Sequence, residues 1–178
     1  DILQLKLDVM IHEDYGFYSY AEYYVLGDVF VLTSPDKEKG TLLELKGKGC
    51  RQMESYLLAQ HRSWYDFLMD ALIEGGVMKR LDLAINDMAG NLDIPELTEK
   101  CNHEECISVF RSFKSYRSGE LVRSNEQDRY GMGNTIYIGS LKSEVYFCIY
   151  EKDYEQYVKY EIPLEDTKIK NRFEIRLK

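Results

Sequence analysis

Three carboxylates, a tyrosine and a lysine stand at positions that suit metal-assisted phosphate chemistry. Glu44, Asp82 and Glu174 would supply hard oxygen ligands, which Mg²⁺ and Mn²⁺ prefer. Tyr150 beside such an ion could act as a nucleophile, because its phenol, with an ordinary pKa of about 10, needs its anion stabilised. Lys152 lies two positions further on and would favour the phenolate or neutralise a phosphate. These residue types therefore predict a divalent-metal site beside an oxygen nucleophile.

The strands that must carry these residues each have one polar and one apolar face. Successive side chains of a strand point to opposite faces, so position parity sorts them into two sets. Between positions 81 and 85, leucine and isoleucine take the odd positions, and the polar set of this strand is Arg80, Asp82 and Asn86. We expect the apolar faces to pack under a long helix and the polar faces to form a site. The polar sets of the other strands are Glu44 with Lys46, Tyr146 with Cys148 and Tyr150, and Arg172 with Glu174 and Arg176.

Simpler interpretations of this polar face stay open. A sheet with one solvated side carries charged residues there without any function. A single tyrosine among the 15 of this chain is more often a core or interface aromatic than a nucleophile. Asp82 fits these interpretations least well, because lone carboxylates are depleted from strands and costly to bury.

The charge pattern limits how the chain would bind nucleic acid. A net charge of −8 argues against indiscriminate coating of DNA, because non-specific affinity comes mainly from Lys and Arg that neutralise phosphates. Two basic segments could still form a local groove, and the second is interleaved with aromatic residues that could stack on unpaired bases. The alternative is a solvated loop and edge strand. The basic residues are Lys46, Lys48 and Arg51, followed by Arg111, Lys114, Arg117, Arg123 and Arg129.

Hydrophobic periodicity predicts an α+β fold with a mostly antiparallel sheet, and with a long helix and shorter helices packed on one face. The long helix is expected over 52–74, closed by Gly75 and Gly76, and shorter helices over 1–10, 94–101 and 153–159. A hairpin is expected over 18–32 with its turn at 27–28. Further strands are expected over 41–46, 77–87, 108–116, 135–139, 144–151 and 169–177.

Length and composition indicate one compact globular domain over 1–178, and the candidate site would make it a catalytic domain. The sequence contains no apolar run that would span a bilayer and no signal pattern at its start, so we expect a cytoplasmic protein with reduced thiols. Cys101, His103 and Cys106 could ligate zinc, but they supply three of the four usual ligands, and a helix end with incidental thiols is the alternative. The chain starts without Met and stops within a predicted strand, so we expect a fragment of a longer chain.

Four ordered segments resemble the replication initiation factor family. They are LLELKGKGCR (42–51), KRLDLAIND (79–87), GNTIYIGSLKSEVYFCIYEKDYEQ (133–156) and NRFEIRLK (171–178). This family holds the rolling-circle replication initiators of staphylococcal-type plasmids and the MobT-type relaxases of conjugative transposons. The resemblance covers nearly the whole chain, and the segments 42–51 and 143–156 are more similar to the relaxases.

The resemblance implies roles for individual residues. The family's nucleophilic tyrosine, in an Arg-x-Tyr-x-Lys pattern, falls on Tyr150 and its lysine on Lys152, whereas its arginine is replaced by Cys148. A second arginine, after the preceding Gly-Ser, is replaced by Leu141. Lys142, Arg172 and Arg176 are the candidate substitutes for phosphate binding. The family's strand acids fall on Glu44, Asp82 and Glu174, with Asn86 or Asp87 where relatives carry further acids.

The implied reaction is metal-dependent nicking of one DNA strand at an origin through a 5′-phosphotyrosyl intermediate. Related relaxases hold their metal with paired histidines, and the three histidines here form no such pair, so the resemblance implies a carboxylate site. The implied partners are single-stranded or hairpin origin DNA and a helicase or the conjugation machinery. Conjugative transfer is the expected setting; a plasmid replication initiator and a non-catalytic origin-binding module are the alternatives.

Overall fold

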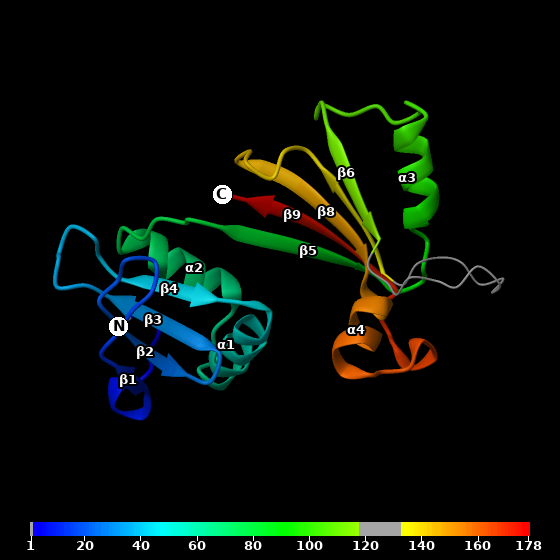
Figure 1. Ribbon diagram of the computed structural model, residues 1–178. Helices are drawn as coiled ribbons and strands as arrows, with labels where there is room; N and C mark the ends of the chain where they lie inside the picture. The colour runs from blue at the N-terminus through cyan, green and yellow to red at the C-terminus, as the bar shows by residue number, and fades with distance from the viewer. Residues whose placement is uncertain (1, 118–132) are drawn as a thin grey trace. The chain divides into compact units, whose positions relative to one another are not determined.

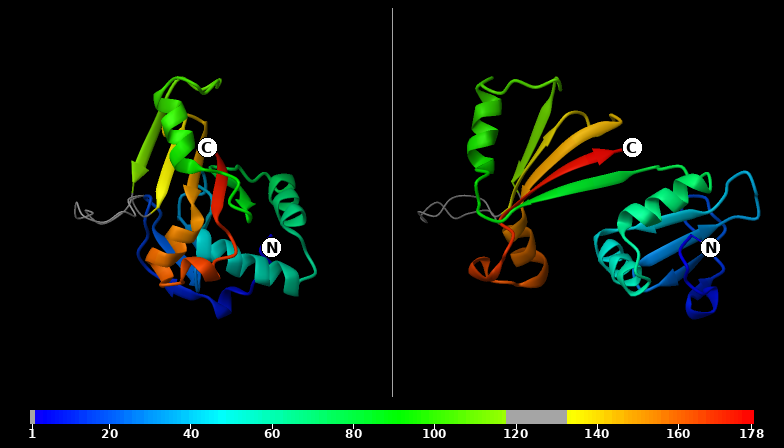
Figure 2. Two further views of the ribbon diagram at one scale, coloured as in Figure 1. Left: turned by 90° about the vertical axis from the view of Figure 1, so that its right-hand side faces the viewer. Right: turned by 180° about the vertical axis from the view of Figure 1, so that it is seen from behind.

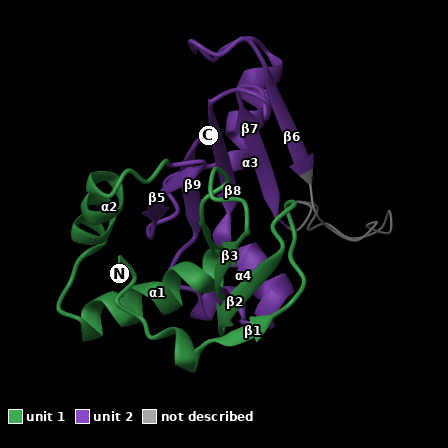
Figure 3. Ribbon diagram, turned by 90° about the vertical axis from the view of Figure 1, so that its left-hand side faces the viewer, with its two compact units in different colours: residues 1–77 green, residues 78–178 purple. Residues whose placement is uncertain are grey.

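Two antiparallel sheets, one in each half of the chain, hold the strands. The computed structural model describes residues 2–117 and 133–178, and the chain divides into two compact units, Asp1–Val77 and Met78–Lys178 (Figure 3). The α+β class with antiparallel pairing is confirmed. The single sheet expected from the sequence is wrong, because the strands form two sheets. Residue alternation determines which face of a strand a side chain occupies, but it does not determine which strands pair. That the two units act as one catalytic domain stays a prediction.

Unit 1 (Asp1–Val77) contains the sheet β1-β2-β3-β4, in which every neighbouring pair is antiparallel. The predicted hairpin is confirmed: Gly27 takes a left-handed φ of +60° in the two-residue turn between β2 and β3, as glycine readily does. The Asp28 amide donates to Gln52 Oε1 (2.7 Å), which ties this turn to the following helix. The strands are β1 (Ile11–Glu13), β2 (Glu22–Leu26), β3 (Val29–Thr33) and β4 (Leu42–Leu45) (Figure 1).

The long helix predicted over 52–74 is interrupted and forms α1 (Gly47–Ala59) and α2 (Trp64–Ile73). His61 has a φ of +55°, and Ser63 begins α2 with a capping box in which Ser63 and Asp66 each accept a bond from the other's backbone amide. Both helices contribute to the core of unit 1. That core contains Val29, Met53, Leu57 and Phe67.

The helix predicted over 1–10 is wrong. The segment has only a 3-10 turn, η1 (Leu7–Val9), and Gln4 takes a φ of +49°. Ile2 and Leu3 pack against the core of unit 1, so tertiary contacts and not helical periodicity account for their apolar character.

Unit 2 (Met78–Lys178) contains the sheet β5-β9-β8-β7-β6, again antiparallel throughout (Figure 2). β9, the last strand of this unit in chain order, lies between β5 and β8, the first strand and the second-last strand, so segments distant in the sequence are neighbours in the sheet. The strands are β5 (Leu81–Asp87), β6 (Phe113–Arg117), β7 (Asn134–Ile138), β8 (Val145–Glu151) and β9 (Asn171–Leu177).

The apolar face of β7 and β8 packs on α3 (Ile94–Asn102), where Ile94, Ile136 and Ile149 form the core, whereas Leu83 and Ile85 of β5 are exposed. The expectation that the long helix covers these strands is therefore wrong, because α1 packs on β3 and β4. After β8 the chain forms α4 (Lys152–Tyr160) and a short 3-10 turn, η2 (Leu164–Asp166). Within the described ranges, none of the helices has the length and apolar character needed to cross a membrane.

Candidate active site on the five-stranded sheet

The register of β5, β9 and β8 brings the predicted polar residues of unit 2 onto one face. Facing residues in neighbouring strands share a side of the sheet. The parity argument is therefore confirmed for these three strands. The rows across β5, β9 and β8 are Asp82–Arg176–Tyr146, Ala84–Glu174–Cys148 and Asn86–Arg172–Tyr150.

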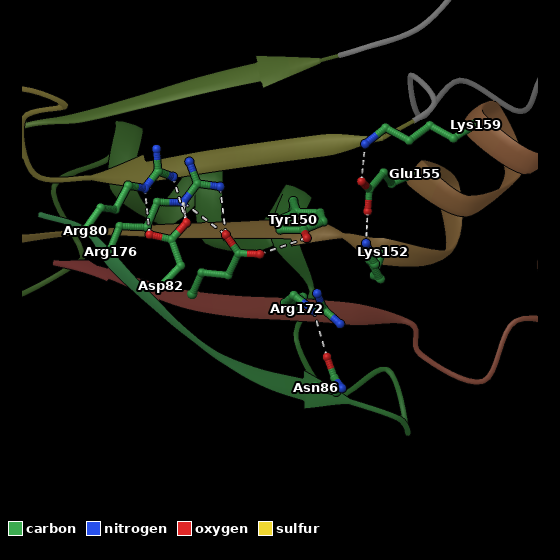
Figure 4. Close-up of polar contacts among 10 residues, drawn as sticks. Arg80, Asp82, Asn86, Tyr150, Lys152, Glu155, Lys159, Arg172 and Arg176 are labelled. Carbon is green, nitrogen blue, oxygen red and sulfur yellow. Dashed lines mark hydrogen bonds and ion pairs between the residues drawn. The ribbon is translucent and has the colours of Figure 1, made fainter. Parts of the chain in front are cut away.

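A continuous chain of polar contacts runs over this face (Figure 4). The Tyr150 hydroxyl donates to Glu174 Oε1 at 2.9 Å, and Arg176 Nη2 lies 2.7 Å from Glu174 Oε2. Arg176 Nε is also 3.7 Å from Asp82 Oδ2. Arg80, which the parity sorting placed on this face but which was not a candidate site residue, binds both Asp82 oxygens at 2.8 and 2.7 Å. Its spacing of two from Asp82 in one strand was the signal for this role.

Tyr150 lies in an environment that keeps its phenol protonated. Burial is the main cause that raises its pKa above the ordinary value, and the negative charges of Glu174 and Glu155 raise it further. The positive charge of Arg172 acts in the opposite direction. Glu174 is itself buried and receives the hydroxyl hydrogen, so it is positioned to accept that proton.

Lys152 begins α4 and does not continue the strand, yet its ammonium lies 5.5 Å from the centre of the Tyr150 ring. The ammonium forms an ion pair with Glu155, and Glu155 also pairs with Lys159. Although burial opposes ionisation, these pairs hold the pKa of Glu155 below its ordinary value. Glu155 was missed in the sequence, where its helical spacing of three and four from the two lysines was the available signal.

Arg172 directly faces Tyr150 across β8 and β9, and its Nε donates to Asn86 Oδ1 at 2.8 Å. Asp87 has the opposite parity and a different task. Its carboxylate accepts bonds from the backbone of Gly90 (2.9 Å) and Leu92 (2.8 Å) and so holds the loop after β5. This explains why Asp87 is unsuited to the polar face.

The two carboxylates of this face fit a hard divalent cation. Arg176 lies against both Asp82 and Glu174, so a cationic group already lies close to both acids. Mg²⁺ commonly binds one or two carboxylates and completes its shell with water and substrate phosphate. No group of three potential metal ligands is gathered anywhere in residues 2–117 and 133–178.

Glu44 belongs to β4 of unit 1 and not to the five-stranded sheet, contrary to the expectation that the three carboxylates share one sheet face. It accepts a bond from the Tyr18 hydroxyl (3.0 Å) and pairs with Lys46 (3.3 Å). Its role as a ligand stays a prediction. Parity assigns a face within a strand and carries no information on which sheet the strand joins.

The predicted DNA-binding residues are spread over both units. Lys46, Lys48 and Arg51 lie at the start of α1 in unit 1, and all three are exposed. Lys142 is exposed in the turn between β7 and β8, and Arg176 belongs to the polar face. For Arg117 only the backbone, at the end of β6, is described, and Arg123 lies outside the described residues.

The thiols of Cys101 and Cys106 lie 3.4 Å apart at the end of α3, and His103 is the C-cap of that helix. Among the residues that the structure describes, these three do not form a metal-binding group. The interpretation as a helix end with thiols therefore fits this segment better than a zinc site.

A pocket of about 380 Å³ lies beside Tyr150, between α4 and the polar face. Thr135, Tyr137 and Tyr150 line the pocket on the sheet side, and residues of α4 line it on the helix side. The helix residues are Tyr154, Glu155, Val158 and Lys159.

Comparison with known proteins matches both units to families. Residues 76–178 match the family model described as replication initiation factor, and residues 1–70 match the rolling circle replication initiation protein N-terminal domain. The chain is 46% identical over 179 residues to the Bacillus subtilis (strain 168) protein named "Putative DNA relaxase NicK", which covers all of this chain and 49% of that protein.

A solved structure, the rolling circle replication initiator protein from Geobacillus stearothermophilus, shares the fold with a TM-score of 0.76 and 25% identity. The similarity covers 99% of this chain and 63% of that one. The chain thus spans about half the length of the curated relative and under two thirds of the solved one. Because the match to the family model over residues 76–178 covers more than half its length, the chain belongs to the replication initiation factor family.

Proposed function

We propose that this chain carries the catalytic core of an enzyme that nicks and rejoins one strand of DNA at an origin, with Tyr150 as the nucleophile. The observation that carries the proposal is the hydrogen bond from the Tyr150 hydroxyl to the buried carboxylate of Glu174, on a face that also presents arginines. A nucleophile, a proton acceptor and cations that suit a phosphate are thereby combined on one face.

In the proposed reaction the Tyr150 oxygen forms a bond to the scissile phosphorus while its proton passes to Glu174 Oε1. The bond from phosphorus to the 3′ oxygen breaks, that oxygen takes up a proton, and a 5′-phosphotyrosyl link remains. Arg172 and Arg176 stabilise charge on the phosphate oxygens. Because one phosphodiester bond replaces another, the reverse reaction rejoins the strand without ATP.

Asp82 and Glu174 would hold Mg²⁺ or Mn²⁺, and such an ion would supply charge that polarises a phosphate oxygen. The positive charge of Lys152 would stabilise the Tyr150 phenolate. Because Lys152 is paired with Glu155, the negative charge of Glu155 partly offsets this effect. The role of Glu44 of unit 1 as a third ligand stays a prediction.

The substrate we propose is origin DNA in single-stranded or hairpin form. The 46% identity to a protein named as a relaxase favours conjugative transfer in the cytoplasm, with a helicase or conjugation machinery as partner. The likeness to a rolling-circle initiator supports plasmid replication as the second candidate.

The test is covalent capture. The purified chain is incubated with a pool of hairpin oligonucleotides that carry a randomised single-stranded loop, and the adduct is located by mass spectrometry. We expect an adduct on Tyr150 that Tyr150→Phe abolishes without loss of fold, because only the hydroxyl is removed. Tyr157→Phe, an exposed tyrosine of α4, is the matched control and should react as wild type.

An adduct on Tyr146 or Tyr154 in the phenylalanine variant, at wild-type level, would overturn the assignment of the nucleophile. Binding of the pool without cleavage under any divalent metal would favour a non-catalytic origin-binding module.

A further inference from the structure

The pocket beside Tyr150 has walls unlike those of a phosphate site. Tyr137 and Tyr154 contribute aromatic surface, and Val158 contributes aliphatic surface at the exposed side of α4. The charged residues of the lining balance: Glu151 and Glu155 are acids, whereas Lys159 and Arg176 are cations already paired with Glu155 and Glu174. A pocket without excess positive charge is suited to a neutral group such as a base.

The form of the lining indicates a flat aromatic ligand with polar edges. Bases removed from a stack are commonly held between aromatic or apolar side chains and recognised through hydrogen bonds at their edges. Thr135 supplies a hydroxyl that can donate or accept such a bond. A volume of about 380 Å³ lies near the lower end for small-molecule pockets, so it suits one base with its sugar and not a stacked pair.

The position of the pocket relates this ligand to the reaction. Tyr150 is both a wall of the pocket and the donor to Glu174, so a base in the pocket is attached to a nucleotide close to the attacked phosphate. We propose that the pocket binds the base of one nucleotide next to the scissile phosphate and selects the sequence that is cut. This inference rests on the proposed function and adds a specificity-determining site to it.

The test is a double-mutant cycle that combines substitution of a pocket residue with removal of one base of the DNA. A substrate recovered from the hairpin pool is compared with copies that carry an abasic site at each position flanking the cut. For wild type, one abasic position should slow adduct formation by about 5- to 150-fold, the range that one base–aromatic stack supplies. With the intact substrate, Tyr154→Ala should form the adduct more slowly than wild type by a similar factor. With the abasic copy, its rate of adduct formation should fall little further.

Two variants keep this test specific. Tyr154→Phe retains the ring and should behave as wild type, and Tyr157→Ala removes an exposed ring of the same helix that does not line the pocket and should also behave as wild type. If Tyr154→Ala does not fold, Val158→Trp at an exposed edge of the pocket should fill it and should likewise flatten the response to the abasic position.

Equal sensitivity of wild type and Tyr154→Ala to every abasic position would overturn the pocket proposal while the adduct on Tyr150 still forms. Absence of any adduct with wild type would instead count against the proposed function. The two failures are therefore distinguishable in one set of reactions.

Discussion

At the scale of single residues, the bond between Tyr150 and Glu174 would determine how the proposed nucleophile is activated. A phenol whose pKa is raised by burial and by nearby acids reacts only if a base removes its proton as it attacks. Glu174 is hydrogen-bonded to the hydroxyl and is itself paired with Arg176. The carboxylate therefore both opposes the free phenolate and is available to accept the proton during attack.

The variant Glu174→Gln separates these two effects. Loss of the negative charge should lower the pKa of Tyr150 below its wild-type value, but burial should keep it above 10, the ordinary value. Adduct formation should nevertheless slow by about 100-fold or more, because the proton acceptor is lost. The pKa is measured by NMR titration of ¹³C-labelled tyrosine, with Tyr150→Phe to assign the signal. An unchanged pKa would show that Glu174 does not act on the phenol.

At the scale of elements, the break between α1 and α2 depends on one short motif. Ser63 caps α2 through the amide of Asp66 (3.2 Å), and Asp66 accepts from the Ser63 amide (2.8 Å). Trp64, the only tryptophan of the chain, follows directly and packs on the core of unit 1. Its fluorescence therefore reports the unfolding of this unit.

Ser63→Ala should lower the free energy of unfolding of unit 1 by about 1 kcal/mol, the usual cost of losing an N-cap. Urea titrations followed by Trp64 fluorescence measure it. Ser55→Ala is the control, because Ser55 is exposed inside α1 and bonds only the carbonyl of Arg51, so its loss should be close to neutral. Equal effects of the two substitutions would contradict the capping role.

The loop after β5 provides a second prediction at this scale. Bonds from the backbone of Leu92 and from Asn171 lower the pKa of Asp87 to about 2, below the ordinary value of 3.8. A lowered folded-state pKa gives stability that is present above about pH 4 and is lost as the pH falls towards about 2. Asp87→Asn should lower the free energy of unfolding by roughly 1–2 kcal/mol at neutral pH.

That difference between wild type and Asp87→Asn should shrink as the pH falls from about 4 to about 2. Urea unfolding followed by circular dichroism at several pH values measures it. Asp93→Asn, which retains an oxygen to cap α3, is the comparison. A difference that stays constant with pH would show that the charge of Asp87 contributes nothing to the loop.

Some features of the fold and of the candidate site could be predicted from local sequence patterns, and others could not. Alternation in β5, β8 and β9 was enough to place Asp82, Tyr150 and Glu174 on a shared face, because parity is a local property. The spacing of Ser63 and Asp66 is typical of a helix start and could have predicted the break in the long helix. The apolar periodicity continues on both sides of this motif, however, and it favoured a single helix. The sheet to which Glu44 belongs, and the pocket beside Tyr150, depend on long-range pairing and on how α4 packs, which local patterns do not encode.

At the scale of the whole molecule, the proposed substrate is a polyanion, whereas the chain is acidic. The net charge is −8, and Arg80 and Arg176 of the polar face are paired with Asp82 and Glu174. A divalent ion that binds Asp82 and Glu174 would release Arg80 and Arg176 from these pairs. We therefore expect nicking to require Mg²⁺ or Mn²⁺ and to cease in EDTA.

Asp82→Asn should weaken Mn²⁺ binding by about tenfold or more, measured by titration calorimetry without DNA. Glu96→Gln, an exposed acid on α3 paired with Lys100, is the control and should bind Mn²⁺ as wild type. Undiminished nicking in EDTA would contradict the metal requirement.

The strand order of unit 2 also governs when the polar face comes into being during synthesis. β5 emerges from the ribosome about 90 residues before β9, which must lie between β5 and β8 before Asp82 and Tyr150 belong to one surface. At roughly 5–20 residues per second, β5 waits for its central partner for about 5–20 seconds. A nascent chain that contains Tyr150 but not yet β9 lacks Glu174, so under the proposed mechanism it would have no nicking activity until β9 has been synthesised.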